Sequence, residues 1–384
     1  MSEFEKQYQN ILNNLQFEDF NWVTKRIIDL TLDTENESFY SRTVAFLDYI
    51  DSQPSTEDIK IECQKILSEL YAFLKNKTEP QKKLLVSCQE MTKKYSSNGF
   101  SLGPISLNIH EGEIIGLVGE NGNGKTTLLR TLCGEFTPTS GILTYHFEYT
   151  DLYDLRTQLV YIPQRTETWH GSMFENLQFT ATHYGYKPSE NKWVVELVLA
   201  RLGLRKYRKH KWKDLSSGYK MRFELARLLL RKSKILLIDE PLANLDILAQ
   251  QTILEDFKTI AKSPFRPLGI VLSSQQLYEV EKTSDQVVFL KNGQQKNLHE
   301  NSASTTERVL NFIVEFETTW TQNALDDLLR KHHLVSLHFN GSTFIAEFDH
   351  EFTSFDFLKI VHDAQIPMNY YRDISNSTRR FFLT

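Results

Sequence analysis

The first 80 residues repeat apolar side chains at a spacing of three and four positions. This spacing occurs in FEKQYQNILNNL, FNWVTKRIIDLTL, ESFYSRTVAFLDYI and STEDIKIECQKILSELYAFL, and it places the apolar side chains of each segment on one face of a helix. The last segment also has a helix start, because Pro54 precedes Ser55 as a candidate N-cap and Glu57 and Asp58 follow in the first turn. The pattern predicts an all-α N-terminal domain over residues 1–80.

The pattern changes to short apolar runs in the middle of the chain. Residues 113–132, EIIGLVGENGNGKTTLLRTL, have the order apolar strand, glycine-rich turn and amphipathic helix, and residues 234–241, KILLIDEP, form a buried strand that ends in two acids. Helical spacing returns within residues 175–204, at Val194, Leu197, Val198 and Leu202. We expect one domain of strands and helices over residues 81–300.

The last part of the chain follows a polar stretch, HENSASTTE at residues 299–307, which is a plausible linker. Beyond it the sequence predicts strand, helix, strand, strand, helix and strand, and an Asn340-Gly341 pair between two alternating runs indicates a hairpin. This βαββαβ order predicts an α+β, ferredoxin-like domain over residues 305–384. Such a fold does not define a function.

Composition restricts the classes of function. The chain has 384 residues, 40% hydrophobic and 24% charged, with a net charge of −5, which argues against a basic nucleic-acid binder. The three cysteines Cys63, Cys88 and Cys133 have no metal-ligand or disulfide spacing and are expected as core thiols in a reducing interior. No run of about 18–20 apolar residues occurs and the start is polar, so we expect neither a membrane span nor a signal peptide.

One short segment is strongly basic. Residues 205–213, RKYRKHKWK, interleave Tyr207 and Trp212 with cations, a composition found in nucleic-acid and anionic-membrane contacts. Runs of like charge are more often solvated surface, and the segment leads directly into a predicted helix. The interpretation as a solvated loop is therefore preferred, and no nucleic-acid partner is expected.

The glycine-rich turn has the chemistry of a phosphate-binding loop. Its glycines let the backbone turn tightly with N–H groups pointing inward, Lys125 can reach the β- and γ-phosphates, and the Thr126 hydroxyl can hold Mg²⁺. The candidate ATP-binding residues of this segment are Gly119, Asn121, Gly122, Asn123, Gly124, Lys125, Thr126 and Thr127. ATP and Mg²⁺ are the cofactors that this motif predicts.

Two adjacent carboxylates complete the candidate chemistry. Asp239 stands at the end of the strand KILLID, where it can bind Mg²⁺, and Glu240 follows where a general base can polarise the attacking water. We expect Glu240 and Lys125 to be catalytic, and Thr126 and Asp239 to hold the metal.

These motifs, in this order, resemble the ATP-binding cassette of ABC transporters over about residues 84–300. Tyr95 matches the aromatic residue that stacks on adenine in that family, and Gln164, in YIPQ, matches the glutamine that contacts Mg²⁺. The sequence LSSGY, with Ser216, Ser217 and Gly218, resembles the family signature Leu-Ser-Gly-Gly-Gln. Asp246, in ANLD at residues 243–246, matches the loop that crosses the dimer interface. The fold class that the resemblance implies for residues 81–300 is an α/β P-loop NTPase cassette.

The resemblance also implies an assembly. In this family two cassettes face each other head to tail, so that the signature of one subunit contacts the γ-phosphate held by the other. We therefore expect a homodimer, or a pair with a related cassette subunit, around two ATP molecules, joined to a membrane permease subunit. The implied location is cytoplasmic, peripheral on the inner face of the cell membrane, and the sequence favours an exporter-type partner.

Two positions depart from the family pattern. Ser217 and Tyr219 replace a glycine and a glutamine of the signature, a change that we expect to preserve the phosphate contact. Gln275 stands where the family has a histidine that contacts the γ-phosphate; an amide can donate a hydrogen bond but carries no positive charge and moves no proton. We expect Gln275 to slow hydrolysis.

Three functions remain open from the sequence. The preferred one is the ATP-hydrolysing subunit of an ABC transporter. The second is a nucleotide-sensing regulatory ABC protein in which Gln275 has silenced most of the turnover. The third is a soluble, non-transport ABC ATPase, which usually carries two cassettes or a long coiled-coil insertion, and neither is visible in this sequence.

Overall fold

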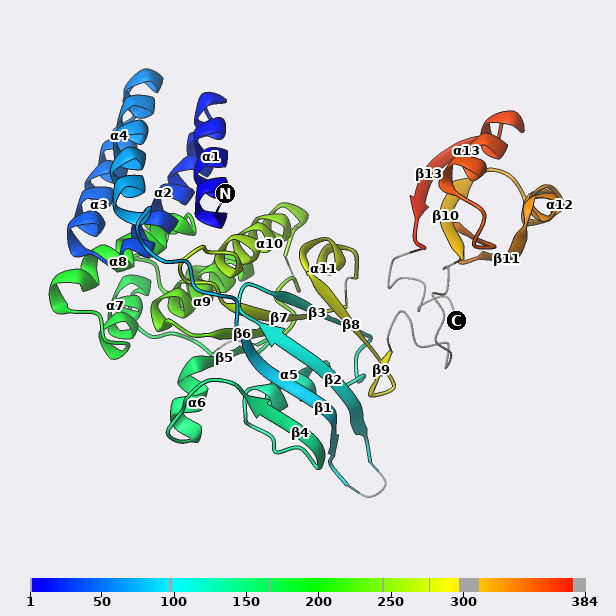
Figure 1. Ribbon diagram of the computed structural model, residues 1–384, viewed down its shortest axis with the longest axis horizontal. Helices are drawn as coiled ribbons and strands as arrows, with labels where there is room; N and C mark the ends of the chain where they lie inside the picture. Colours follow the sequence, from blue (N-terminus) through cyan, green and yellow to red (C-terminus); the bar gives the residue numbers. More distant parts are fainter. Residues whose placement is uncertain are drawn as a thin grey trace. The chain divides into compact units, whose positions relative to one another are not determined.

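The computed structural model describes residues 2–96, 99–165, 167–243, 245–275, 277–296 and 311–375. The chain divides into two compact units, residues 1–295 and 296–384, which are described separately below (Figure 1). Most of the expected linker at residues 299–307 lies outside the described residues.

The first unit begins with four helices, as the apolar spacing predicts. They are α1 (Glu3–Gln16), α2 (Phe20–Thr34), α3 (Glu37–Asp51) and α4 (Thr56–Leu74). Polar side chains cap each start, including the predicted Ser55, whose Oγ accepts the Asp58 N–H at 3.2 Å. Their buried faces form one hydrophobic cluster that includes Ile27, Leu67 and Leu70.

These helices pack on the rest of the unit. Helices α2 and α3 lie against α8 (Pro188–Arg201), and Figure 1 shows α1–α4 gathered above α8. Phe265, from the loop after α10 (Ile247–Ala261), belongs to the hydrophobic cluster of the N-terminal helices. Residues 1–295 therefore form one compact unit, and the expected domain boundary at residue 80 stays a prediction.

The centre of the unit is a parallel sheet that orders the candidate site. The sheet has the order β5-β6-β7-β3-β8-β9, and β5, β6, β7, β3 and β8 pair in parallel. Its strands are β3 (Ile114–Val118), β5 (Leu159–Ile162), β6 (Ile235–Ile238), β7 (Gly269–Ser274), β8 (Gln286–Lys291) and β9 (Gln294–Lys296). Because neighbouring parallel strands end at the same edge, the segments that follow β3, β5, β6 and β7 come together there.

A second, antiparallel sheet packs against this core. Its order is β2-β1-β4, with β1 (Leu84–Lys94), β2 (Ser101–His110) and β4 (Ser140–Tyr145). Apolar side chains from both sheets and from α5 (Lys125–Leu132), such as Ile105, Leu117 and Leu128, form one cluster. The sheet places Tyr95, the residue directly after β1, near the start of α5.

The described part of the first unit has four further helices. They are α6 (Leu152–Gln158), α7 (Met173–His183), α9 (Ser217–Arg231) and α11 (Leu277–Thr283), with short 3₁₀ turns at Arg205–Tyr207 and Trp212–Asp214. The basic run 205–213 is only partly solvated, because Trp212 is buried and stacks on Trp169, and Arg205 pairs with Asp48 and Asp51 of α3. The run is thus partly a contact with the N-terminal helices.

The second unit has the predicted βαββαβ order. Its elements are β10 (Phe312–Thr318), α12 (Gln322–Leu329), β11 (Leu334–Phe339), β12 (Phe344–Phe348), α13 (Ser354–Asp363) and β13 (Met368–Asp373). The strands pair antiparallel in the order β11-β12-β10-β13. Both helices contribute to one aromatic-rich core with the sheet, which includes Phe316, Phe348 and Phe357.

Candidate nucleotide site

The turn between β3 and α5 requires glycine at two of its positions. A Cβ on Gly119 would lie 2.5 Å from the carbonyl oxygen of Leu290, and Gly124 has a φ of 96°, the left-handed region that disfavours other residues. Asn123 is fixed as well, because its Oδ1 accepts the Asn292 N–H at 3.0 Å. Asn121, Gly122 and Asn123 border an open hollow of about 480 Å³. The loop therefore presents its backbone beside a space large enough for a ligand.

Lys125 is buried and directed into the loop. Its Nζ donates to the carbonyl oxygen of Gly119 at 2.6 Å and to that of Glu120 at 3.2 Å. The same Nζ lies 3.2 Å from Glu240 Oε1. The structure thus unites two of the residues predicted to be catalytic.

Asp239 is held by hydroxyl groups on three sides. Its Oδ2 accepts hydrogen bonds from Thr126 Oγ1 at 2.7 Å and from the Tyr161 hydroxyl at 3.3 Å, and its Oδ1 accepts one from Ser273 Oγ at 2.6 Å. Burial, together with the negative charge of Asp239, raises the pKa of Tyr161. The phenol therefore remains protonated and donates to the carboxylate.

Glu240 is positioned by the end of the neighbouring strand. Its backbone N–H donates to Ser273 Oγ at 2.9 Å, and its Oε2 accepts the backbone N–H of Gln275 at 3.2 Å. The side chain of Gln275 is exposed, so the contact seen here belongs to the main chain of that position. Ser273 consequently contacts both acidic residues, although the sequence analysis did not select it.

The outer residues of the predicted site lie on the same rim. The Tyr95 hydroxyl is 3.1 Å from Thr127 Oγ1, its ring meets Phe136 edge to face at 5.9 Å, and its side chain is 54% exposed. Gln164 is exposed two residues after β5, whose last residue accepts the Asp239 N–H at 2.9 Å. Both residues are thus near the phosphate loop or the carboxylates, and their predicted contacts with adenine and Mg²⁺ stay predictions.

The signature residues form a separate site, which we call the signature hollow. It has a volume of about 300 Å³ and lies at the starts of α9 and α10; its lining residues include Ser216, Ser217, Gly218, Leu245, Asp246 and Ala249. Ser216 caps α9 and Asp246 caps α10, each accepting a backbone N–H three residues later. Asn244 of the ANLD segment lies outside the described residues. The hollow contains no residue of the phosphate loop.

The residues beside Lys125 fit a nucleotide with a hard cation. The Thr126 hydroxyl and the Asp239 carboxylate are adjacent oxygen donors, the set that Mg²⁺ prefers together with phosphate oxygens and water. A further hollow of about 430 Å³ opens beside Thr126 and Tyr161. The described residues contain no group of three His, Cys, Asp or Glu side chains that could hold a metal by themselves, so a cation here would need ligands from phosphate and water.

Each helix in the described part of the chain is too short or too polar to traverse a lipid bilayer.

Comparison with known proteins agrees with this geometry. The family profile described as "ABC transporter" matches residues 102–243. The ABC transporter ATP-binding protein NatA of Bacillus subtilis (strain 168) is 30% identical over 199 residues, which are 50% of this chain and 78% of that protein. The spermidine/putrescine import ATP-binding protein PotA of Mycoplasma mycoides subsp. mycoides SC is 31% identical over 245 residues, which are 62% of this chain and 66% of PotA.

A solved structure shares the fold. CbiO1 from Clostridium perfringens, described as part of the ABC transporter complex cbiONQ, superposes with a TM-score of 0.51 and 25% sequence identity, covering 56% of this chain and 87% of that one. The range matched by the family profile includes the phosphate loop and the paired carboxylates described above. The chain therefore belongs to the ABC transporter family, as an ATP-binding protein with an ABC ATPase cassette.

Proposed function

We propose that this chain hydrolyses ATP as the energy-coupling subunit of an ABC transporter, in a head-to-tail pair of cassettes that binds two MgATP and drives a membrane permease. The observation that supports it best is the group formed by Lys125, Asp239 and Glu240, in which Ser273 contacts both carboxylate residues. The proposed location is the cytoplasmic face of the cell membrane, with the permease as the partner that crosses it.

The chain's own groups have separable roles in hydrolysis. Lys125 and the backbone N–H groups at the start of α5 bind the β- and γ-phosphates. Glu240 orients a water molecule and accepts its proton, while the water oxygen bonds to the γ-phosphorus and the bond to the bridging β-γ oxygen breaks, releasing ADP and phosphate. Thr126, Asp239 and Gln164 would hold Mg²⁺, which supplies positive charge to the phosphates when bound.

The signature hollow supports the paired arrangement. Ser216, Ser217 and Gly218 lie at a helix start, where backbone N–H groups and the helix dipole favour an anion. Because this hollow contains no residue of the chain's own phosphate loop, the anion would be the γ-phosphate of ATP bound to a second cassette. A two-fold pair then completes two sites at once.

The direction of transport is a separate matter. The sequence favours an exporter-type partner, but that assignment is not confirmed, since the relatives include PotA, which is named as an import protein. The proposed function therefore includes a permease partner without a direction.

A nucleotide-sensing role is the second candidate, and Gln275 is the observation that favours it. Its exposed amide replaces the histidine that resemblance leads us to expect, while the ATP-binding groups are present. In that case ATP would still drive pairing, with little turnover.

Steady-state ATPase activity with Mg²⁺, together with light scattering, separates these functions. We expect turnover by the parent, and a loss of about 10²-fold or more with an ATP-trapped dimer for Glu240→Gln, because the general base is removed. Glu351→Gln, an exposed carboxylate on the second unit, is the matched control and should keep the parent rate. Pairing without turnover above the Glu240→Gln background, also in the presence of the permease, would favour the sensing role.

A further inference from the structure

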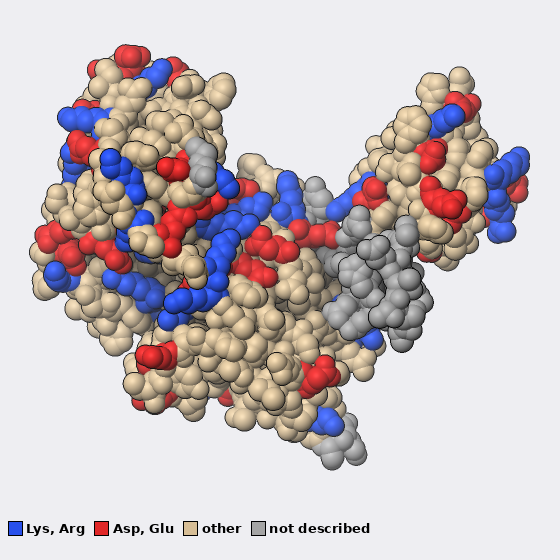
Figure 2. All heavy atoms as spheres, viewed as in Figure 1, with Lys and Arg blue, Asp and Glu red and all other residues tan. Residues whose placement is uncertain are grey.

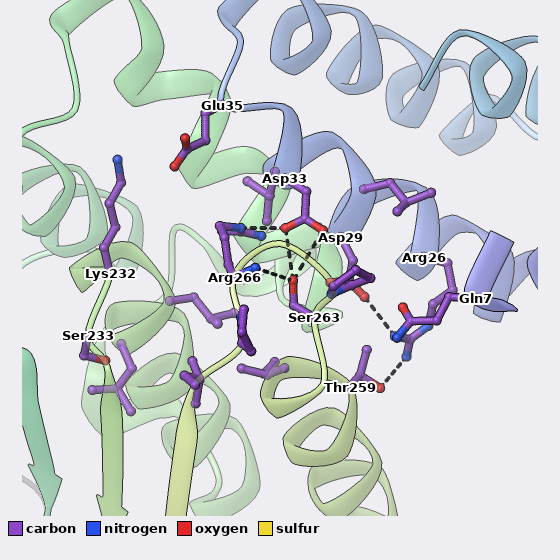
Figure 3. Close-up of a pocket in the computed structure, with 18 of the residues that line it drawn as sticks. Gln7, Arg26, Asp29, Asp33, Glu35, Lys232, Ser233, Thr259, Ser263 and Arg266 are labelled. Atoms are coloured by element: carbon purple, nitrogen blue, oxygen red, sulfur yellow. Dashed lines mark hydrogen bonds and ion pairs between the residues drawn. The ribbon is translucent and has the colours of Figure 1, made fainter. Parts of the chain in front are cut away.

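A partly open cavity lies between the N-terminal helices and the cassette, and none of the predicted nucleotide-site residues lines it. Its volume is about 250 Å³, somewhat below the roughly 300 Å³ at which pockets for drug-sized ligands begin. The walls come from α1 and α2, the end of α9, the start of β6, and the segment from the end of α10 to β7. Figure 3 shows this cavity, with Lys232 and Ser233 on one side and Gln7, Arg26 and Thr259 on the other.

Most of the wall is apolar. The apolar lining residues are Ile11, Leu30, Leu32, Leu228, Leu229, Leu236, Ile260, Pro264, Pro267 and Leu268. An apolar wall of this kind holds the hydrocarbon part of a ligand by excluding water from both surfaces. The occupant should therefore have an apolar body.

Beside the cavity, positively charged side chains outnumber the carboxylates that pair with them. Arg26 Nη1 pairs with Asp29 Oδ2 at 3.1 Å, but Asp29 Oδ1 also accepts from the buried Arg201 at 2.7 Å. Arg201 and Lys25 in turn share Asp256, at 2.6 Å and 3.4 Å. Three cations thus share two carboxylates, so these five side chains together carry one excess positive charge.

Arg26 is the cation of this group that lines the cavity. Burial lowers its pKa, since desolvation disfavours the charged guanidinium. Its Nη2 contacts Thr259, whereas its Nε is buried without a hydrogen-bond acceptor among the described residues. Ser233 Oγ, on the opposite wall, is also buried without a partner in the described chain. Both groups can donate to acceptor oxygens of a ligand. Asp29 Oδ2, on the same wall, has no hydrogen bond in the described chain and contacts Arg26 as an ion pair.

Of the other charged groups of the cavity, Asp33 has a partner of opposite charge and Lys232 has none in the described chain. Asp33 pairs with Arg266 at 2.6 Å and accepts from Ser263 at 3.1 Å, as Figure 3 shows. Lys232 at the rim lies over the Tyr186 ring at 4.5 Å, and no carboxylate pairs with it in the described chain. Figure 2 shows Lys and Arg side chains gathered along the boundary between the N-terminal helices and the cassette. The rim therefore adds a cation that has no carboxylate partner among the described residues.

We propose that this cavity is a binding site for a small amphipathic organic anion, with its apolar body against the leucine wall and its acidic head hydrogen-bonded to Arg26. Lys232 at the rim adds attraction for the negative charge. The site is distinct from the nucleotide residues and stands independently of the proposed function.

The cavity is lined by parts of two elements, α9 and β6, that carry or directly precede predicted nucleotide-site residues. Leu228 and Leu229 line it from the last turns of α9, the helix that begins at the signature. Leu236 lines it from β6, the strand directly followed by Asp239. An occupant would contact both elements.

Isothermal titration calorimetry with decanoate, below its micelle concentration, tests the proposal on the full chain. We expect one decanoate per chain, and binding of decyltrimethylammonium, which has the same apolar body and the opposite charge, to be at least about tenfold weaker. Arg26→Gln should weaken decanoate by about tenfold or more. Arg42→Gln, an arginine of α3 that lies outside the cavity, should leave the affinity unchanged.

A second test fills the cavity with a larger side chain. Leu229 and Leu268 are only half-buried, so Leu229→Trp and Leu268→Trp can place an indole in the space, and each should abolish decanoate binding. A thermal unfolding midpoint close to that of the parent identifies the variants that keep the fold. Absence of decanoate binding by the parent, equal binding of the cationic amphiphile, or unchanged binding by both folded tryptophan variants would each overturn the proposal.

Discussion

Lys125 Nζ lies 3.2 Å from Glu240 Oε1, so the lysine of the phosphate loop and the proposed general base form an ion pair in a largely buried setting. Both side chains are about nine-tenths buried or more, with exposures of 6% and 10%. Removing one partner of such a pair leaves the other charge uncompensated, which is more costly than removing both. The two residues should therefore be coupled energetically.

A double-mutant cycle measures this coupling. Lys125→Ala and Glu240→Gln should each lower the free energy of unfolding, and the double variant should lose less than the sum, by about 0.5–3 kcal/mol. Denaturant unfolding of the four proteins gives the value. Lys125→Ala combined with Glu351→Gln should be additive, and additivity in the test pair as well would contradict the pairing.

Gln275→His should accelerate ATP turnover. The imidazole can carry a positive charge at a position that a neutral amide cannot, and one transition-state contact is worth about 10²–10³ in rate. We expect a gain of about tenfold or more in kcat. The backbone N–H that contacts Glu240 is common to all side chains at this position, so Gln275→Ala should retain that contact and show no gain. Equal rates for the His variant and the parent would show that Gln275 does not limit turnover.

Arg201 should be a major determinant of stability. It is 1% exposed and bonded to Asp29 of α2 and Asp256 of α10, so Arg201→Met leaves the buried Asp256 and the partly buried Asp29 with fewer partners. We expect a loss of about 3–5 kcal/mol in the free energy of unfolding. Arg42→Met removes a half-exposed pair with Glu69 and should cost only about 0–1 kcal/mol. A similar small loss for both variants would count against a role of Arg201 in joining these helices.

The three thiols should be unreactive in the folded chain. Burial raises the pKa of Cys63 and Cys88 to about 12 and that of Cys133 to about 11, so the nucleophilic thiolate is absent at pH 8. Ellman's reagent should report no free thiol in the native chain and three after denaturation. Ser342→Cys, in an exposed turn, is the positive control and should react at once.

The same shifts define a pH dependence. The pKa of each thiol is raised in the folded chain above the ordinary value of about 8.5, so the unfolded chain loses thiol protons at a lower pH. These groups therefore lower the free energy of unfolding as the pH rises from about 8.5 towards 11. A decrease in the free energy of unfolding over this pH range that is smaller in a Cys88→Ala variant would agree with this sign, and an increase over that range would contradict it.

The site residues could be predicted where the chemistry is contiguous in the chain. Lys125, Thr126, Asp239 and Glu240 lie in two short motifs, each with its own strand, and local apolar patterning locates both strands. Ser273 could not be predicted in the same way. Its role depends on the pairing of β7 beside β6, with Ile238 opposite Leu272, and this register arises from tertiary packing.

For the N-terminal helices too, the local structure could be predicted from the sequence and the tertiary contacts could not. Local amphipathic spacing predicts these helices, and Ser55 is the N-cap of α4, as the sequence predicts. Their docking on α8 and α10 depends on Arg201 and Asp29, which are 172 positions apart. Each is an ordinary charged residue in the sequence, and only the folded chain shows that they form a pair in which Arg201 is buried.

Phe265 has a consequence for how this chain can be altered by recombination. The residue belongs to the loop between α10 and β7, yet it lies in the core of the N-terminal helices and meets Phe4 at a ring distance of 5.2 Å. A cassette exchanged with that of a relative must therefore carry a large apolar side chain at this position, or the helices lose part of their interior. The N-terminal helices and the loop that carries Phe265 are consequently expected to be inherited together. A chimera joined near residue 80 would combine the helices with a cassette that lacks their matching Phe265.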